Sequence, residues 1–167
     1  HNTVCVDGAD QSVSGGRFMW LRKARSRVER MPGSPGQFDF RGSHDGYLRL
    51  PDPARHIREV KFDAASATLL VSDRVTARGA HLVEQFWHFA PHLSVERSAN
   101  GVQVRGRKFA MLLEPQGEGA ALELVRGQED PPLGWYSRSY ETKQPCTVLK
   151  VSAESNGTPL DCRITIS

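Results

Sequence analysis

The chain has 167 residues, and its 22 basic and 19 acidic side chains leave a net charge of +3. Apolar residues make up 38% of it, which is low for a globular protein but above the range of disordered chains. No stretch approaches the roughly 20 apolar residues that a membrane-spanning helix needs, and 15 Gly with 10 Pro disfavour long helices.

The first predicted strand stands at the very start of the chain. Residues 1–8 form an alternating run that enters an Asp7-Gly8 turn, with no initiator Met and no signal-peptide pattern. We therefore expect a single domain over residues 1–167 that is a piece of a longer protein.

A basic segment follows at residues 17–30, which contain six basic residues and one acidic residue, Glu29. Most of the basic residues are Arg, whose planar guanidinium binds a carboxylate, sulfate or phosphate through two parallel hydrogen bonds. If the segment is one strand, Lys23, Arg25 and Arg27 share one face of it. That face either lies in solvent or meets an anionic partner.

Alternation with a period of two dominates the rest of the chain and predicts strands. It is clearest at residues 69–74, 82–89, 102–105, 109–113, 149–151 and 164–166. Turn signals such as Asp45-Gly46, Asn100-Gly101 and Asn156-Gly157 separate the runs, and Asn-Gly favours a hairpin whose two central residues have positive φ. Residues 63–67 offer at most one helical turn. The pattern predicts an all-β fold, an antiparallel β-sandwich of about 10–14 short strands with no long helix.

The three cysteines form neither a disulfide framework nor a metal cluster. Cys146 and Cys162 flank the Gly157 turn, so either a disulfide across two strands or two free buried thiols explains their spacing.

The six histidines show no metal-binding motif. His88 and His92 are four residues apart, but a strand would separate them by roughly 13 Å, too far for one ion. The residues alone therefore predict a structural role for each histidine.

Catalytic motifs are absent from the sequence as well. There is no G-x-S-x-G elbow and no Gly-rich phosphate loop, and the carboxylates Asp45, Asp73 and Glu84 have no distinguishing context. Aromatic residues make up 8% of the chain and no RNP-like motif occurs, which argues against nucleic acid as a partner.

Five stretches in order resemble the C-terminal β-domain of heparinase II/III-like polysaccharide lyases. They are HNTVCVDGADQSVSGGRFMW, SHDGYLRLPDPARHIREVKFD, LLVSDRV, GAHLVEQFWHFAP and GWYSRSY with a following Pro145. The resemblance covers residues 1–91 and returns more weakly near Gly134.

The resemblance implies an N-terminal α/α toroid, absent here, followed by an antiparallel β-sandwich, with the substrate in the cleft between them. Such enzymes cleave uronate-containing acidic polysaccharides by β-elimination, in which a His or Tyr base removes the C5 proton. Because the family's catalytic residues lie upstream of His1, no catalytic residue is expected in this fragment. We expect it to support and close the cleft and to be inactive alone.

The resemblance also gives His1 a role. In the family's H-N-T motif the His is a zinc ligand, and the other two protein ligands, a His and an Asp, lie upstream. One ligand cannot close a tetrahedral site, so we expect zinc in the parent protein and not in the fragment.

Lys23, Arg25 and Arg27 become candidates for contact with the acidic polysaccharide, or with acidic residues of the toroid. The rival function is a carbohydrate-binding module that holds acidic glycans without cleaving them. The resemblance also implies a periplasmic or secreted location.

Overall fold

A computed structural model describes residues 1–16, 18–117 and 119–167 of the chain. In these ranges seventeen strands and one short 3-10 helix form, and no helix is long and apolar enough to cross a membrane. The prediction of an antiparallel all-β fold without a long helix is confirmed. The seventeen strands exceed the predicted 10–14 because four of them are only two residues long, which is shorter than the alternating runs that the prediction counted. Arg17, part of the basic segment, lies outside the described residues.

The smaller of the two main sheets has four antiparallel strands. In spatial order they are β1 (Val4–Val6), β9 (His81–His88), β16 (Thr147–Ser155) and β13 (Ala121–Arg126).

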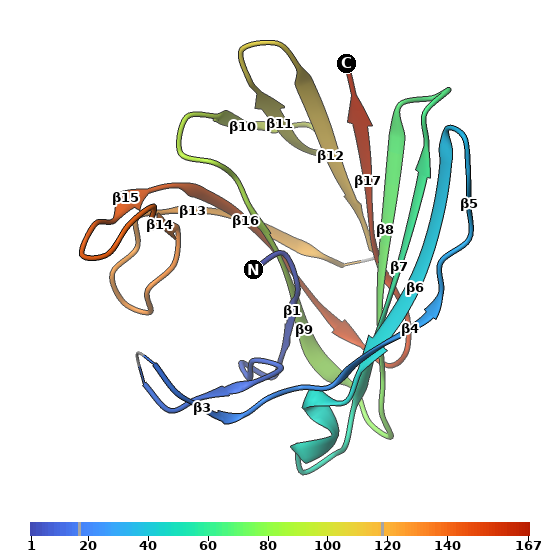
Figure 1. Ribbon diagram of the computed structural model, residues 1–167, viewed down its shortest axis with the longest axis vertical. Coiled ribbons are helices and arrows are strands. Elements are labelled where there is room, and N and C mark those ends of the chain that lie inside the picture. Colours follow the sequence, from blue (N-terminus) through green and yellow to red (C-terminus); the bar gives the residue numbers. More distant parts are fainter. Residues whose placement is uncertain (17, 118) are drawn as a thin grey trace.

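The larger sheet has nine strands, and in Figure 1 it extends from the top of the molecule, at β10, to its right-hand side, at β5. Their order is β10 (Ser94–Ser98), β11 (Gly101–Arg105), β12 (Ala110–Gln116), β17 (Leu160–Ile166), β8 (Thr68–Thr76), β7 (Arg55–Asp63), β6 (Gln37–His44) and β4 (Ser26–Arg30), with β5 (Gly33–Ser34) also paired to β6.

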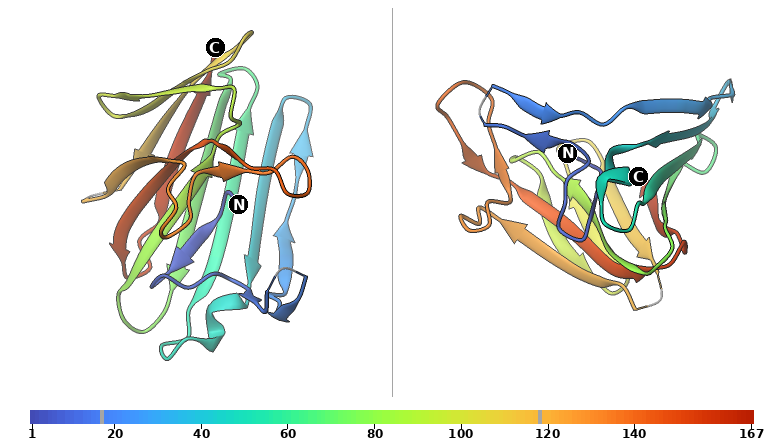
Figure 2. Two further views of the ribbon diagram at one scale, coloured as in Figure 1. Left: turned by 90° about the vertical axis from the view of Figure 1, so that its left-hand side faces the viewer. Right: turned by 90° about the horizontal axis from the view of Figure 1, so that it is seen from below.

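Two small hairpins lie outside these sheets. The first pairs β2 (Val13–Ser14) with β3 (Trp20–Arg22), and the second pairs β14 (Trp135–Tyr136) with β15 (Gln144–Pro145). Figure 1 and the right-hand view of Figure 2 place both hairpins on the same side of the molecule, away from β5.

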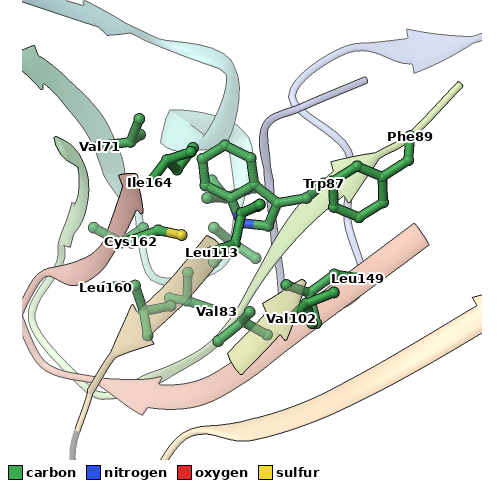
Figure 3. Packing of buried hydrophobic residues seen from close by; sticks show 14 of the residues in the cluster. Val71, Val83, Trp87, Phe89, Val102, Leu113, Leu149, Leu160, Cys162 and Ile164 are labelled. Carbon is green, nitrogen blue, oxygen red and sulfur yellow. The ribbon is translucent and has the colours of Figure 1, made fainter. Parts of the chain in front are cut away.

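Buried side chains from both sheets form one apolar core between them, part of which Figure 3 shows. The smaller sheet contributes Val83, Trp87 and Leu149, and the larger sheet contributes Leu113 and Ile164. The predicted alternation places these residues on the inward faces of their strands, because successive side chains of a strand point to opposite sides. Burial of this apolar surface is the main stabilising contribution.

The Asn100-Gly101 signal correctly predicts a hairpin, although for a different reason from the one expected. Ser98 pairs with Gly101, so the turn precedes the glycine, and neither Asn100 nor Gly101 has a positive φ. Instead, a Cβ at position 101 would lie 1.9 Å from the carbonyl oxygen of Leu113 on the neighbouring strand. The close approach of that strand requires the glycine.

Asp45-Gly46 does not form the expected hairpin turn. Instead, the 3-10 helix η1 (Gly46–Arg49) begins there, between β6 and β7. The single helical turn considered for residues 63–67 is a plain turn at residues 64–67, between β7 and β8. Within η1, Tyr47 is completely buried and its hydroxyl donates a hydrogen bond to the carbonyl oxygen of Val4 at 2.6 Å. The short helix therefore anchors β1. Burial of Tyr47 and its bond to Val4 outweigh the local preference of Asp45-Gly46 for a hairpin turn.

The cysteines are free, so the two-thiol alternative is correct. Cys146 immediately precedes β16 of the smaller sheet, whereas Cys162 lies on β17 of the larger sheet, paired with Val71. Because the two cysteines belong to different sheets, they do not face each other across a pair of neighbouring strands.

Candidate functional site

Lys23 and Arg25 lie in the segment that joins β3 to β4, and both are exposed. With Arg22 and Asp45 they line a surface hollow of ≈ 790 Å³, which we call the basic hollow. The structure thus brings two of the three predicted basic residues together.

Arg27 is separate from Lys23 and Arg25, so the prediction that the three share one strand face is wrong. The backbone at Lys23 and Arg25 is not part of a strand, and only Arg27 lies within β4, opposite Ser43 of β6. Arg27 lines a different hollow of ≈ 240 Å³. Alternation predicts a common face only where the chain stays extended and paired, and here it does so only from β4 onward.

The basic hollow keeps a net positive charge, because its lining includes three basic side chains, Arg22, Lys23 and Arg25, and, in the ranges that the structure describes, one carboxylate, Asp45. Among the described residues, no ion pair includes Lys23 or Arg25, whereas Arg30 pairs with Asp39 at 2.9 Å. Asp45 accepts a hydrogen bond from the main-chain nitrogen of Arg25 at 2.7 Å and so fixes the backbone there. The hollow can therefore bind an anion through these two side chains.

His1 is exposed, and its main-chain nitrogen lies 3.3 Å from Nε2 of His88. The next residue ties this segment to both sheets. The carbonyl oxygen of Asn2 accepts a hydrogen bond from Nη1 of Arg58, and its side-chain oxygen accepts one from the main-chain nitrogen of His88 at 2.8 Å.

The described residues do not fit a zinc ion. Nowhere in residues 1–16, 18–117 and 119–167 do three or more His, Cys, Asp or Glu side chains converge as metal ligands. Because a structural zinc site needs about four ligands, His1 cannot form one with its neighbours here. Its role as a zinc ligand stays a prediction.

A polar network inside the sandwich was missed by the sequence analysis. Asp73 of β8 is buried, and its carboxylate accepts hydrogen bonds from Nε2 of His56 at 2.7 Å and from two nitrogens of Arg58 at 2.7 and 2.6 Å. The side chain of Gln85 on β9 donates to the same carboxylate at 2.7 Å. These residues, together with His44, form what we call the Asp73 network, which links the two sheets.

The partners of the two histidines determine the direction of their hydrogen bonds. Nδ1 of His44 accepts from the main-chain nitrogen of Gly46 at 3.2 Å, so its proton lies on Nε2, which is 2.9 Å from Nδ1 of His56. Nδ1 of His56 accepts a hydrogen bond from Nε2 of His44, and Nε2 of His56 donates one to Asp73. Every ring nitrogen therefore has a partner, and neither histidine keeps a lone pair for a substrate proton.

Two pKa shifts show how the network is charged. Burial alone would raise the pKa of Asp73, but the hydrogen bonds from His56 and Arg58 outweigh it and hold that pKa well below its usual value. Burial and the neighbouring His56 lower the pKa of His44 to about 4. At neutral pH the network contains an ionised Asp73 paired with Arg58 and a neutral His44, an arrangement that fits a structural role.

The signal for this network was present in the strand pattern. Asp73 shares its strand face with Leu69 and Val71, which are apolar. A carboxylate at an inward position needs several donors. The donors themselves come from β7 and β9, and only the strand pairing reveals them.

Comparison with known proteins gives one family and a set of similar folds. The family model described as "Heparinase II/III-like, C-terminal" matches residues 1–165. No curated protein matches the sequence.

Among solved structures, the heparan sulfate lyase HepC from Pedobacter heparinus is 14% identical, with a TM-score of 0.73, and the match covers 99% of this chain and 24% of that one. The heparinase III BT4657 gene product is 15% identical, with a TM-score of 0.71, and the match covers 99% of this chain and 23% of that one. At such identities the likeness establishes the fold alone, and the chain spans about a quarter of the length of either protein.

Proposed function

The chain belongs to the heparinase II/III-like family as its C-terminal domain, and from this premise we propose that it forms one wall of the substrate cleft in a polysaccharide lyase. The substrate is a uronate-containing acidic polysaccharide, which the parent protein cleaves by β-elimination. The domain supports and closes the cleft together with a preceding toroid.

The observation that carries this proposal is the net positive charge of the basic hollow in a chain of this family. Lys23 and Arg25 are exposed on the same segment, and within the described part of the chain Asp45 is the one carboxylate that lines the hollow, so it offsets only part of their charge and that of Arg22. A guanidinium binds a carboxylate or sulfate in a planar, two-bond geometry, so Arg25 suits the acidic groups of such a polymer.

The elimination itself belongs to residues outside this chain. It requires a base that reaches the C5 proton of the uronate, and the paired ring nitrogens of His44 and His56 do not offer one. The family resemblance assigns the catalytic residues to the part of the parent protein upstream of His1, so we expect this chain by itself to be inactive.

The test is to incubate the chain with heparin, heparan sulfate and alginate and to follow the ultraviolet absorbance of the unsaturated product. We expect no turnover by the chain and turnover by the parent protein. Appreciable product from the chain alone would overturn this division of labour.

A second function, glycan binding without cleavage, is favoured by the exposure of Lys23 and Arg25. It predicts that the chain alone binds heparan sulfate and that the double variant Lys23→Ala/Arg25→Ala binds about tenfold more weakly. The affinity should fall as salt is added, because exposed charges are screened over about 10 Å at 0.1 M salt. Isothermal titration calorimetry without any heat would exclude this function.

The zinc ion and the periplasmic or secreted location are parts of the same proposal that rest on the resemblance alone. His1 would contribute one zinc ligand in the parent protein, beside a His and an Asp that precede it.

A further inference from the structure

The β2–β3 hairpin exposes a run of large apolar side chains. Phe18, Met19, Trp20 and Leu21 are 87%, 56%, 55% and 67% exposed. Scattered apolar side chains are normal on a protein surface, but four in succession are out of place unless they bind a partner. The hairpin lies at the lower left of Figure 1, at the periphery of the molecule, where a partner can reach it.

Two of these side chains join one from η1 in a continuous apolar surface. Met19 and Leu21 lie together over Gly15, where an added Cβ would be 3.0 Å from Cε of Met19 and 2.8 Å from Cγ of Leu21. Leu48 of η1 is 43% exposed and lines the basic hollow together with Leu21. We call Met19, Leu21 and Leu48 the apolar face. Because two of its members line the basic hollow, the apolar face adjoins that hollow directly.

Hydrogen bonds tie the hairpin to the body of the domain. The hydroxyl of Ser12 accepts a hydrogen bond from the main-chain nitrogen of Ala24 at 3.0 Å. The guanidinium of Arg49, in η1, donates to the carbonyl oxygens of Asp10 and Gly46, and so joins the hairpin's base to the short helix. A surface that is already ordered loses little conformational entropy when it binds, which favours a stable contact.

The chemistry of the apolar face argues against two possible occupants. An acidic polysaccharide does not suit it, because thioether and aliphatic side chains offer no hydrogen bonds to replace the water around hydroxyl and acidic groups. A second copy of the chain does not suit it either. In a two-fold dimer the same surface faces itself, so Lys23 and Arg25 of both copies would come together, and like charges repel.

The preceding part of the parent protein fits the apolar face. In both solved relatives, about three quarters of the chain lies outside the region that this chain matches. A cleft needs a second wall, and a domain that covers the apolar face stands next to Lys23 and Arg25, where that wall is needed. Burial of apolar surface stabilises such contacts between domains of one chain.

We propose that the preceding domain of the parent protein docks on the apolar face through an apolar patch of its own, while Lys23 and Arg25 stay open beside the contact. This inference rests on the proposed function, from which it takes the preceding domain. It adds the residues that hold the two walls of the cleft together.

Methionine oxidation tests this inference with a control inside the same molecule. Met19 is 56% exposed, and Met31, which lies between β4 and β5 and away from the hairpin, is 61% exposed. The folded parent protein is treated with hydrogen peroxide, and each sulfoxide is measured by mass spectrometry. We expect Met19 to oxidise about tenfold more slowly than Met31 in the folded parent, and at the same rate as Met31 after unfolding in urea.

A matched pair of leucine variants of the parent protein tests the docking itself. Leu48→Ser places a polar group in the contact and should bring the oxidation rate of Met19 close to that of Met31. The control is Leu82→Ser, at a side chain that is also 43% exposed but lies outside the apolar face, and it should leave Met19 protected. Both leucines are exposed in this chain, so neither substitution should unfold it.

Several outcomes would overturn the inference. They are equal oxidation of Met19 and Met31 in the folded parent, and a Leu48→Ser variant that protects Met19 as well as Leu82→Ser does. Protection that appears only with added heparan sulfate would assign the apolar face to the polysaccharide, and protection that is lost when a dimeric parent is diluted to monomers would assign it to a second copy.

These outcomes are distinct from a failure of the proposed function, which stands in each of them as long as the parent cleaves a uronate-containing polysaccharide. If Met19 is protected in a parent that cleaves no such polysaccharide, the proposed function is wrong and the docking surface stands.

Discussion

The interior of the sandwich is held together differently at its two ends. Between β11, β12 and β16 it is apolar, and Val102, Leu113 and Leu149 are almost completely buried. Between β7, β8 and β9 the same interior contains Asp73 with Arg58 and its other donors. The first region is stabilised by burial of apolar surface alone. The second also buries apolar side chains, such as Val75 and Trp87, but adds hydrogen bonds to a buried charge, and it reaches the N-terminal segment through Asn2.

This difference matters for tolerance to substitution. An apolar core accepts other apolar residues of similar volume, because the hydrophobic effect has no direction. A buried carboxylate depends on every one of its donors, since an unpaired partner is expensive to bury. The Asp73 end therefore specifies one arrangement of the strands and of residues 1–3.

The largest effect is expected from breaking the Asp73 network. Asp73→Ala leaves Arg58, His56 and Gln85 without their acceptor, and it should lower the free energy of unfolding by about 3–5 kcal/mol in urea denaturation. The loss should depend on pH. The lowered pKa of Asp73 means that its contribution is present above its unfolded pKa, near 3.9, and is lost as the pH falls through the folded-state value. An unchanged unfolding curve for Asp73→Ala at neutral pH would contradict the claim that the buried charge stabilises the region between β7, β8 and β9.

Breaking the apolar end should cost somewhat less. Leu113→Ala removes buried methyl groups and leaves a cavity, so we expect a loss of about 2–4 kcal/mol in the same denaturation experiment. The loss should be insensitive to pH between about 4 and 8, because no titratable group is removed. The control is Leu82→Ala, whose side chain is 43% exposed and should change stability by less than about 1 kcal/mol. Equal losses at the two leucines would contradict the assignment of the core.

A second ion-paired histidine, His81, sharpens the comparison nearer the surface. His81 lies between Asp7, whose Oδ2 is 2.6 Å from Nδ1, and Asp52, whose Oδ2 is 3.2 Å from Nε2. His81 itself is buried, but the side chain of Asp7 is 49% exposed, whereas that of Asp73 is 0% exposed, so water screens the His81–Asp7 pair more than the His56–Asp73 pair.

The hydrogen bond to Asp7 raises the pKa of His81 above its usual 6.5, helped by Asp52. A raised folded-state pKa means that the stabilisation is fully present below the unfolded value and is lost as the pH rises through the folded one. We therefore expect the stability advantage of the unmodified chain over His81→Gln to fall by about 1 kcal/mol from roughly pH 6 to pH 9. Denaturation curves at several pH values measure it, and an advantage that grows with pH would show that His81 is neutral in the folded chain.

Some properties of the candidate functional residues could be predicted from the sequence, and others could not. The basic character of residues 22–25 was readable directly, because charge needs no partner to be recognised. Their grouping was not, since Lys23 and Arg25 leave the strand while Arg27 stays in it. A second hollow of ≈ 260 Å³, lined by Trp20, Phe86 and Leu133, could not be predicted, because these residues come from three distant parts of the chain.

Local sequence patterns were enough to predict the all-β class, many of the strands and the family, because side-chain alternation and turn chemistry act between residues that are close in the chain. They left β6, β7, β10 and β13 unassigned, and they do not show which side chains meet. Asp73 finds its donors on β7 and β9, Gly46 begins a helix that Tyr47 anchors to β1, and Asn2 bonds to both sheets. Each of these contacts joins segments far apart in sequence, and strand pairing and sheet packing bring them together.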